Sequence, residues 1–156
     1  MADMQNTIFA PDAHAMEKLG KHIAKAREKG GVIYLQGELG AGKTTLARGI
    51  IHALGITGPV KSPTYTLLES YETPTIPIYH LDLYRLQDPE ELEYIGIRDY
   101  LDENALFLIE WPEHGKEGIP VADLIISIQV LTAGRLVTAS SPCFSSKPTQ
   151  VCRQAS

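Results

Sequence analysis

Residues Gly37–Thr44 read Gly-Glu-Leu-Gly-Ala-Gly-Lys-Thr, and they lie between a short apolar run and an amphipathic stretch. The apolar run Val32–Gln36 predicts a buried strand, and Thr44–Leu54 predicts a helix that ends at Gly55. A glycine-rich segment in this context fits the pattern G-x-x-x-x-G-K-[ST], in which backbone amides surround an anion. The sequence therefore predicts a phosphate-binding loop in a fold where strands and helices alternate.

The residue types of this loop each suit phosphate chemistry. Gly37, Gly40 and Gly42 allow tight turns and let the backbone approach a phosphate with no Cβ in the way. Their amides and the dipole of the following helix favour an anion. Lys43 can reach the β- and γ-phosphates of a nucleotide, and the Thr44 hydroxyl can ligate Mg²⁺. The alternative is a glycine-rich connection with a solvated lysine, which the flanking strand and helix disfavour.

A second magnesium ligand is expected from an acid at the end of a neighbouring strand. The segments Leu106–Glu110 and Ile78–Asp82 both end in such an acid. Glu110 follows the more uniformly apolar segment, so we assign Glu110 to the metal. Asp82 stays open as the alternative ligand, and either carboxylate can instead be an ordinary strand-end group that faces water.

The segment Ser62–Thr66 lies one predicted helix after the phosphate loop. In GTPases the loop at this position carries a threonine that senses the γ-phosphate and its metal. Thr64 and Thr66 are both candidates for that role. On local sequence alone, a Ser-Pro turn that leads into a strand is the simpler interpretation.

The whole pattern predicts an α/β fold of the P-loop NTPase type, with three layers. We expect a central, largely parallel sheet with an antiparallel edge, and helices on both faces. Residues 1–139 form the expected single domain, and the Ser-rich residues 140–156 are expected to be a poorly ordered tail. The other expected helices cover 12–29, 88–94 and 97–101, and the other expected strands cover 65–71, 76–83, 105–109, 124–130 and 136–138.

Composition narrows the classes of protein that fit. The formal net charge of −5 disfavours a protein that holds DNA or RNA by itself. No apolar stretch is long enough to span a bilayer, and residues 1–12 lack the basic and apolar regions of a signal peptide. We therefore expect a cytoplasmic protein with no membrane contact. Cys143 and Cys152 have no spacing typical of a metal site, and a structural disulfide is not expected.

Five segments occur together, in one order, and carry a resemblance to a known family. They are the phosphate loop Gly37–Thr45, Lys61–Thr66, His80–Arg85, Asp88–Leu92 and Ile109–Pro112. This combination resembles the TsaE (YjeE) family of bacterial ATPases of tRNA threonylcarbamoyladenosine synthesis. The likeness covers about residues 8 to 138, and the joint pattern is far more specific than the phosphate loop alone.

The resemblance implies a slow ATPase that uses ATP and Mg²⁺ and has the TsaD and TsaB proteins as partners. Those partners carry the threonylcarbamoyl transfer to tRNA, so contact with tRNA is indirect. By analogy Thr44 and Glu110 would hold Mg²⁺ and Lys43 would hold the phosphates. Asp82 and Thr64 or Thr66 would be the candidates for the switch and for positioning the water. The segment near Asp12 and the turn Gly134-Arg135 would lie at the adenine end. The full expected nucleotide-binding set is Asp12, Glu38, Leu39, Gly40, Ala41, Gly42, Lys43, Thr44, Thr45, Gly134 and Arg135.

Two other functions fit a phosphate loop of this kind. One is a small-molecule kinase, which normally needs an arginine-bearing lid, whereas this chain shows no arginine cluster beyond Arg85 and Arg98. The other is a binding module that uses ATP only to fix its shape for a partner.

The chain also departs from the family at Ser140–Ser156, where neither a further strand nor an apolar helix is evident.

Overall fold

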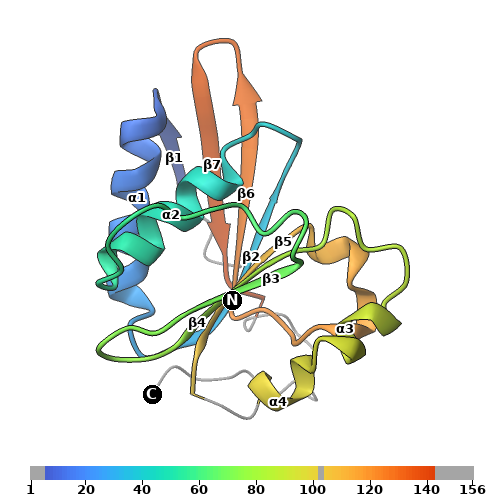
Figure 1. Ribbon diagram of the computed structural model, residues 1–156. Coiled ribbons are helices and arrows are strands. Elements are labelled where there is room, and N and C mark those ends of the chain that lie inside the picture. The colour runs from blue at the N-terminus through green and yellow to red at the C-terminus, as the bar shows by residue number, and fades with distance from the viewer. Residues whose placement is uncertain (1–5, 102–103, 143–156) are drawn as a thin grey trace.

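The computed structural model describes residues 6–101 and 104–142 of the 156-residue chain. Seven strands form one sheet in the order β1-β7-β6-β2-β5-β4-β3 (Figure 1). The strands are β1 (Asn6–Ala10), β2 (Gly31–Gly37), β3 (Leu68–Tyr71), β4 (Ile78–Asp82), β5 (Leu106–Glu110), β6 (Leu124–Leu131) and β7 (Gly134–Ser140). The helices are α1 (Ala13–Ala26), α2 (Lys43–Ala53), α3 (Glu90–Tyr94) and α4 (Ile97–Leu101), with 3₁₀ turns at Pro112–His114 and Lys116–Gly118.

The centre of the sheet is parallel, and antiparallel pairs lie at both sides. Strand β2 pairs in parallel with β5 and with β6, and β5 pairs in parallel with β4. Strand β3 is antiparallel to β4, while β7 is antiparallel to both β6 and β1. The predicted parallel sheet with an antiparallel edge is therefore confirmed, and the carboxyl ends of β2, β4 and β5 meet at one edge.

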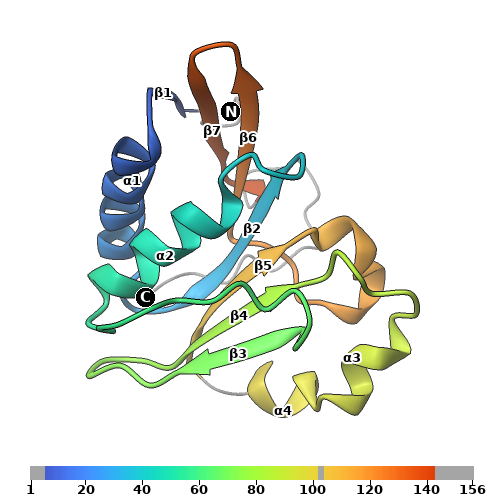
Figure 2. The same ribbon diagram turned by 45° about the horizontal axis from the view of Figure 1, so that its top comes forward.

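Helices cover both faces of the sheet, as predicted. Figure 2 shows α1 and α2 together on one side, and the short helices α3 and α4 on the other. The α2 side is packed with fully buried aliphatic residues such as Leu46, Ile50 and Leu108. Each such side chain contributes about 2 kcal/mol of burial free energy. The opposite side buries Phe107, Leu81 and Leu92 in a second cluster, so β4 and β5 are buried on both faces.

Two glycines let α1 and α2 pack unusually close to one another. A Cβ built on Gly49 of α2 would lie 2.5 Å from the Glu17 carbonyl oxygen, and one on Gly20 of α1 would lie 2.9 Å from the Leu46 carbonyl oxygen. Any larger residue there would push the helices apart. Asp12 caps α1 by accepting from the Ala15 amide at 2.8 Å, which fixes where this helix begins.

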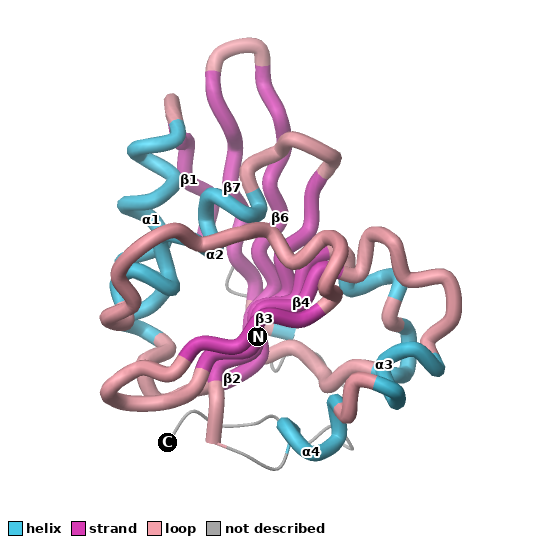
Figure 3. The backbone as a smooth tube through the Cα atoms, viewed as in Figure 1, coloured by secondary structure: helices cyan, strands magenta, loops and turns pink. Residues whose placement is uncertain are grey.

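The structure differs from the sequence-based expectation in three places. Strand β1 was not predicted, because it is an edge strand with four exposed residues and no clear alternation. Residues 54–67 form a long loop between α2 and β3, so the strand expected from 65 begins only at Leu68 (Figure 3). Strand β7 continues through Ser140, one residue beyond the expected domain end. Of the expected tail at 140–156, residues 143–156 with both cysteines lie outside the described residues.

Within residues 6–101 and 104–142, no helix combines the length and apolar character needed to cross a membrane.

Candidate functional site

The phosphate loop leaves β2 at Gly37 and enters α2 at Lys43. Gly37, Gly40 and Gly42 all have positive φ values, of 157°, 78° and 109°. A Cβ on Gly37 would lie 2.9 Å from the Ile128 carbonyl oxygen, so the close approach to β6 also requires glycine. The strand–loop–helix arrangement predicted for this segment is confirmed. The loop amides precede the N-terminus of α2, where an anion is favoured.

Lys43 is buried at the base of the loop, with a relative exposure of 5%. Its Nζ donates to the carbonyl oxygens of Gly37 at 2.5 Å and Glu38 at 2.9 Å. The ammonium also lies 4.2 Å from the centre of the Trp111 ring. Burial lowers the pKa of Lys43 below its ordinary value, and the negative charge of Glu110, first among the nearby carboxylates, opposes that shift.

Thr44 and Glu110 meet across the loop. The Thr44 hydroxyl donates to both Oε1 and Oε2 of Glu110, each at 3.2 Å. Oε2 of Glu110 also lies 2.6 Å from Nε2 of His80, a residue with no exposed surface. An ionised carboxylate only accepts, so His80 donates from Nε2. Its Nδ1 has no hydrogen-bond partner within residues 6–101 and 104–142. Sequence reasoning did not place His80 in the site and so did not anticipate this contact.

Asp82 lies beside Glu110, because the two residues are paired in register between β4 and β5. Its Oδ2 accepts from the Thr64 hydroxyl at 3.0 Å and from the Ser62 hydroxyl at 3.4 Å. The Thr66 hydroxyl instead donates to Oε1 of Glu69 at 3.0 Å, away from the cavity lining. The structure thus brings Thr64 to the two acids and leaves Thr66 on the flank of β3.

A cavity of about 370 Å³ lies over these groups. Four of its lining residues are absent from the set that sequence reasoning assigned to the site: Ser62, Tyr84, Arg85 and Trp111. The guanidinium of Arg85 lies over the Tyr65 ring. The lining residues are Leu39, Gly40, Ala41, Gly42, Lys43, Thr44, Thr45, Ser62, Thr64, Asp82, Tyr84, Arg85, Glu110 and Trp111.

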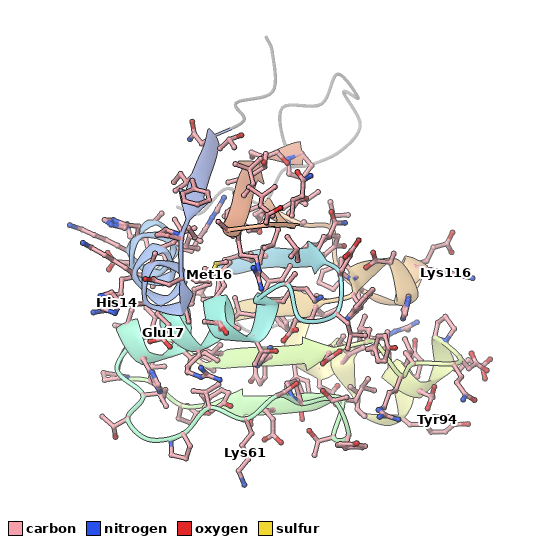
Figure 4. All side chains as sticks on the ribbon, turned by 90° about the horizontal axis from the view of Figure 1, so that it is seen from above. His14, Met16, Glu17, Lys61, Tyr94 and Lys116 are labelled. Atoms are coloured by element: carbon pink, nitrogen blue, oxygen red, sulfur yellow. The ribbon has the colours of Figure 1, made fainter. Side chains whose placement is uncertain are left out.

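A second, smaller cavity of about 170 Å³ adjoins the loop on its other side. Asp12 lines it from the start of α1, and Gly134 with Arg135 lines it from the start of β7. Arg135 binds the loop directly, donating to the carbonyl oxygens of Ala41 at 3.0 Å and Gly40 at 3.3 Å. Met16 points from α1 toward the same region (Figure 4). The segment near Asp12 and the turn Gly134-Arg135 are far apart in the sequence, and they meet at one end of the phosphate loop.

The donor set suits a nucleotide and a hard divalent cation. The Thr44 hydroxyl and the carboxylates of Glu110 and Asp82 offer oxygen atoms, which Mg²⁺ prefers. Lys43 and the loop amides offer positive charge and hydrogen-bond donors beside them. The two cavities share Gly40, Ala41, Gly42 and Thr45 in their linings, so an elongated ligand can lie along the loop.

Known proteins are similar to this chain in sequence and in structure. A family model described as "Threonylcarbamoyl adenosine biosynthesis protein TsaE" matches residues 10–137. The tRNA threonylcarbamoyladenosine biosynthesis protein TsaE of Haemophilus influenzae is 50% identical over 127 residues, which cover 78% of this chain and 80% of that protein. The protein of the same name from Bacillus subtilis is 38% identical over 123 residues, covering 79% and 75% of the two chains.

A solved structure is also similar over most of the chain. The crystal structure of YdiB from Bacillus subtilis superposes with a TM-score of 0.75 at 28% sequence identity. The match covers 90% of this chain and 88% of that one.

Proposed function

The chain belongs to the TsaE family, and on that premise we propose that it is a slow, magnesium-dependent ATPase that assists threonylcarbamoyl transfer to tRNA. The observation that carries the proposal is the arrangement of Lys43, Thr44 and Glu110 around one cavity at the N-terminus of α2. Phosphate, metal and nucleotide each have a matching group there.

The residues divide into three roles in this proposal. The loop amides and Lys43 hold the phosphates, and Lys43 exchanges its two carbonyl partners for phosphate oxygens. Thr44 and Glu110 hold Mg²⁺, which when bound neutralises charge on the β- and γ-phosphates. His80 orients the Glu110 carboxylate by its hydrogen bond to Oε2. Asp82, held by the Thr64 hydroxyl, positions the attacking water.

The proposed reaction converts ATP and water into ADP and inorganic phosphate. The water oxygen bonds to the γ-phosphorus while the bond from that phosphorus to the β–γ bridging oxygen breaks. The electron pair of that bond leaves with ADP, and the water proton ends on the released phosphate or in solvent. The chain contributes position and electrostatic stabilisation, and no covalent intermediate with the protein is needed.

The smaller cavity is the proposed site of the adenosine end. Asp12, Gly134 and Arg135 line it, and its contact with the loop that is proposed to hold the phosphates supports this assignment. The proposed partners are the TsaD and TsaB proteins, with tRNA reached only through that complex. The proposal further places the protein in the cytoplasm.

Phosphate release from ATP tests this function directly. The purified chain is assayed with and without Mg²⁺, alone and together with TsaB and TsaD. We expect slow, magnesium-dependent release that rises in the complex. Tight ATP binding with no release under any condition would support a non-hydrolysing module instead. Transfer of the γ-phosphate to a small molecule would support a kinase.

A further inference from the structure

Arg85 stands in the larger cavity on a turn whose backbone is tied to both acids. The Leu83 amide donates to the Glu110 carbonyl oxygen at 3.0 Å. The Tyr84 amide donates to Oδ1 of Asp82, also at 3.0 Å. These bonds fix the backbone that precedes Arg85 relative to the carboxyl ends of β4 and β5. The side chain of Arg85 therefore starts from a constant position beside the cavity.

The guanidinium of Arg85 rests on a weak partner at the rim. Its Cζ lies 4.5 Å from the centre of the Tyr65 ring, and Nη2 lies 3.4 Å from the Tyr65 hydroxyl. Tyr65 itself is 84% exposed, so this contact is largely in water. An exposed cation–π contact amounts to a preference of only about two- to fivefold. A phosphoryl group offers the same guanidinium a stronger, charge-assisted partner.

Arg85 differs from the other charged residues of the cavity lining in the partner that it now contacts. The charged residues of the described lining are Lys43, Asp82, Arg85 and Glu110. Lys43 binds two loop carbonyl groups, and the two carboxylates bind hydroxyl groups of the site. Arg85, in contrast, contacts the side chain of Tyr65 at the rim of the cavity. Its planar fork of donors suits two oxygens of one phosphoryl group.

We propose that Arg85 is an arginine finger supplied in cis, and that the exposed ring of Tyr65 is its resting place. In the hydrolysis step above, Arg85 leaves Tyr65 and donates hydrogen bonds to the γ-phosphoryl oxygens as the bond to ADP breaks. It neither gains nor loses a proton, and it stabilises the charge that develops there. This inference rests on the proposed ATPase function and deepens it.

The position of Tyr65 connects this finger to the threonine loop. Tyr65 follows Thr64, whose hydroxyl binds Asp82, and the Leu67 amide closes the turn on the Pro63 carbonyl oxygen at 2.8 Å. A rearrangement of Thr64 at the γ-phosphate therefore moves the ring on which Arg85 rests. Binding of the γ-phosphate and release of Arg85 from Tyr65 are therefore coupled.

The test compares Arg85→Ala and Arg85→Lys with the unchanged chain. Single-turnover release of labelled γ-phosphate is measured with Mg²⁺ present, and binding of the β,γ-imido analogue of ATP is measured separately. We expect Arg85→Ala to slow release at least about 100-fold while analogue affinity changes by less than about threefold. Arg85→Lys keeps the charge without the fork, so its rate should fall between the two.

Arg98→Ala is the matched control. Arg98 is an exposed arginine on α4 that pairs with Glu93 at 2.9 Å, away from the cavity lining. Its release rate should equal that of the unchanged chain. A low, non-denaturing concentration of guanidinium chloride should restore part of the rate in Arg85→Ala and should not affect Arg98→Ala.

Tyr65 provides an independent variant. Tyr65→Ala removes the competing resting place, so phosphate release should rise by about two- to fivefold. The same substitution added to Arg85→Ala should change nothing, because Tyr65 acts through Arg85. A rise of equal size in both backgrounds would overturn the proposed resting role.

The outcomes separate this inference from the function on which it rests. Hydrolysis by Arg85→Ala at the normal rate would overturn the finger alone. Parallel losses of analogue affinity and rate would make Arg85 a ground-state phosphate ligand and would also overturn it. No phosphate release from the unchanged chain, alone or with TsaB and TsaD, would overturn the ATPase and the finger together. Melting curves check folding, which an exposed side chain such as Arg85 should not alter.

Discussion

The two walls of the larger cavity are built in different ways. The glycine-loop wall, residues 37–45 with Glu110, is fixed by buried lysine and histidine contacts and by glycines in required conformations. The threonine-loop wall, Ser62 and Thr64 with Asp82, is held by hydroxyl groups on a long connection that includes the highly exposed Tyr65. The first wall is suited to holding a ligand, and the second is suited to responding to it.

Loss of Lys43 should produce the largest effect, because it removes the central cation of the glycine-loop wall. We expect Lys43→Ala to weaken ATP binding by at least about 100-fold, since a buried charge-assisted contact to phosphate is lost. Titration calorimetry measures the affinity. Lys21→Ala, on the exposed face of α1, is the control and should bind normally. Unchanged affinity in Lys43→Ala would refute the phosphate assignment.

Removing the charge of Glu110 and removing the charge of Asp82 should have different effects on binding and hydrolysis. Glu110→Gln should retain some nucleotide binding but lose the response of binding and hydrolysis to Mg²⁺, with a rate about 100-fold lower. Asp82→Asn should slow hydrolysis while binding still responds to Mg²⁺. Magnesium titrations of both variants decide between them. If only Asp82→Asn loses the metal response, the metal ligand is Asp82 and the two walls exchange roles.

A smaller effect is expected at His80, which supports the glycine-loop wall from behind. His80→Leu removes the donor to Glu110 and should weaken the apparent affinity for Mg²⁺ by about tenfold. His80→Gln places an amide donor near the same point and should recover part of that loss. The readout is the magnesium concentration that gives half-maximal hydrolysis. Equal behaviour of the two variants would show that His80 only fills space.

The smallest effect is expected within the threonine loop. Thr64→Val removes the hydrogen bond to Asp82 and should lower hydrolysis about fivefold, the equivalent of one ordinary hydrogen bond. Thr66→Val removes a hydroxyl that binds Glu69 and should leave the rate nearly unchanged. Rate measurements on this matched pair show which threonine serves the site. A larger loss in Thr66→Val would contradict the placement seen in the structure.

The glycine-loop wall could be predicted from sequence because its chemistry is local. Eight consecutive residues specify the loop, and a uniformly apolar strand leads directly to Glu110. The long helices and central strands were also predictable, since each buries a face with regular spacing. The strand β1 was not, because an exposed edge strand lacks that spacing.

The contacts of the threonine-loop wall depend on tertiary placement. Thr64 and Thr66 are equivalent candidates in the sequence, and only the turn before β3 directs one to Asp82 and the other to Glu69. The contact of His80 with Glu110 follows from strand register, which local sequence does not specify. Arg85 and Tyr65 are twenty residues apart, so no local pattern brings them together.

In the proposed function, the close crossing of α1 and α2 at Gly20 and Gly49 relates the two ends of the bound nucleotide. Asp12 begins one helix beside the smaller cavity, and Lys43 begins the other beneath the larger one. Because the crossing point allows no extra atom, the packing of the two helices fixes the distance between the proposed base site and the proposed phosphate site. The helix pair therefore selects for ligands of one length. A ligand that lacks the base or the phosphates would leave one of the two cavities unfilled.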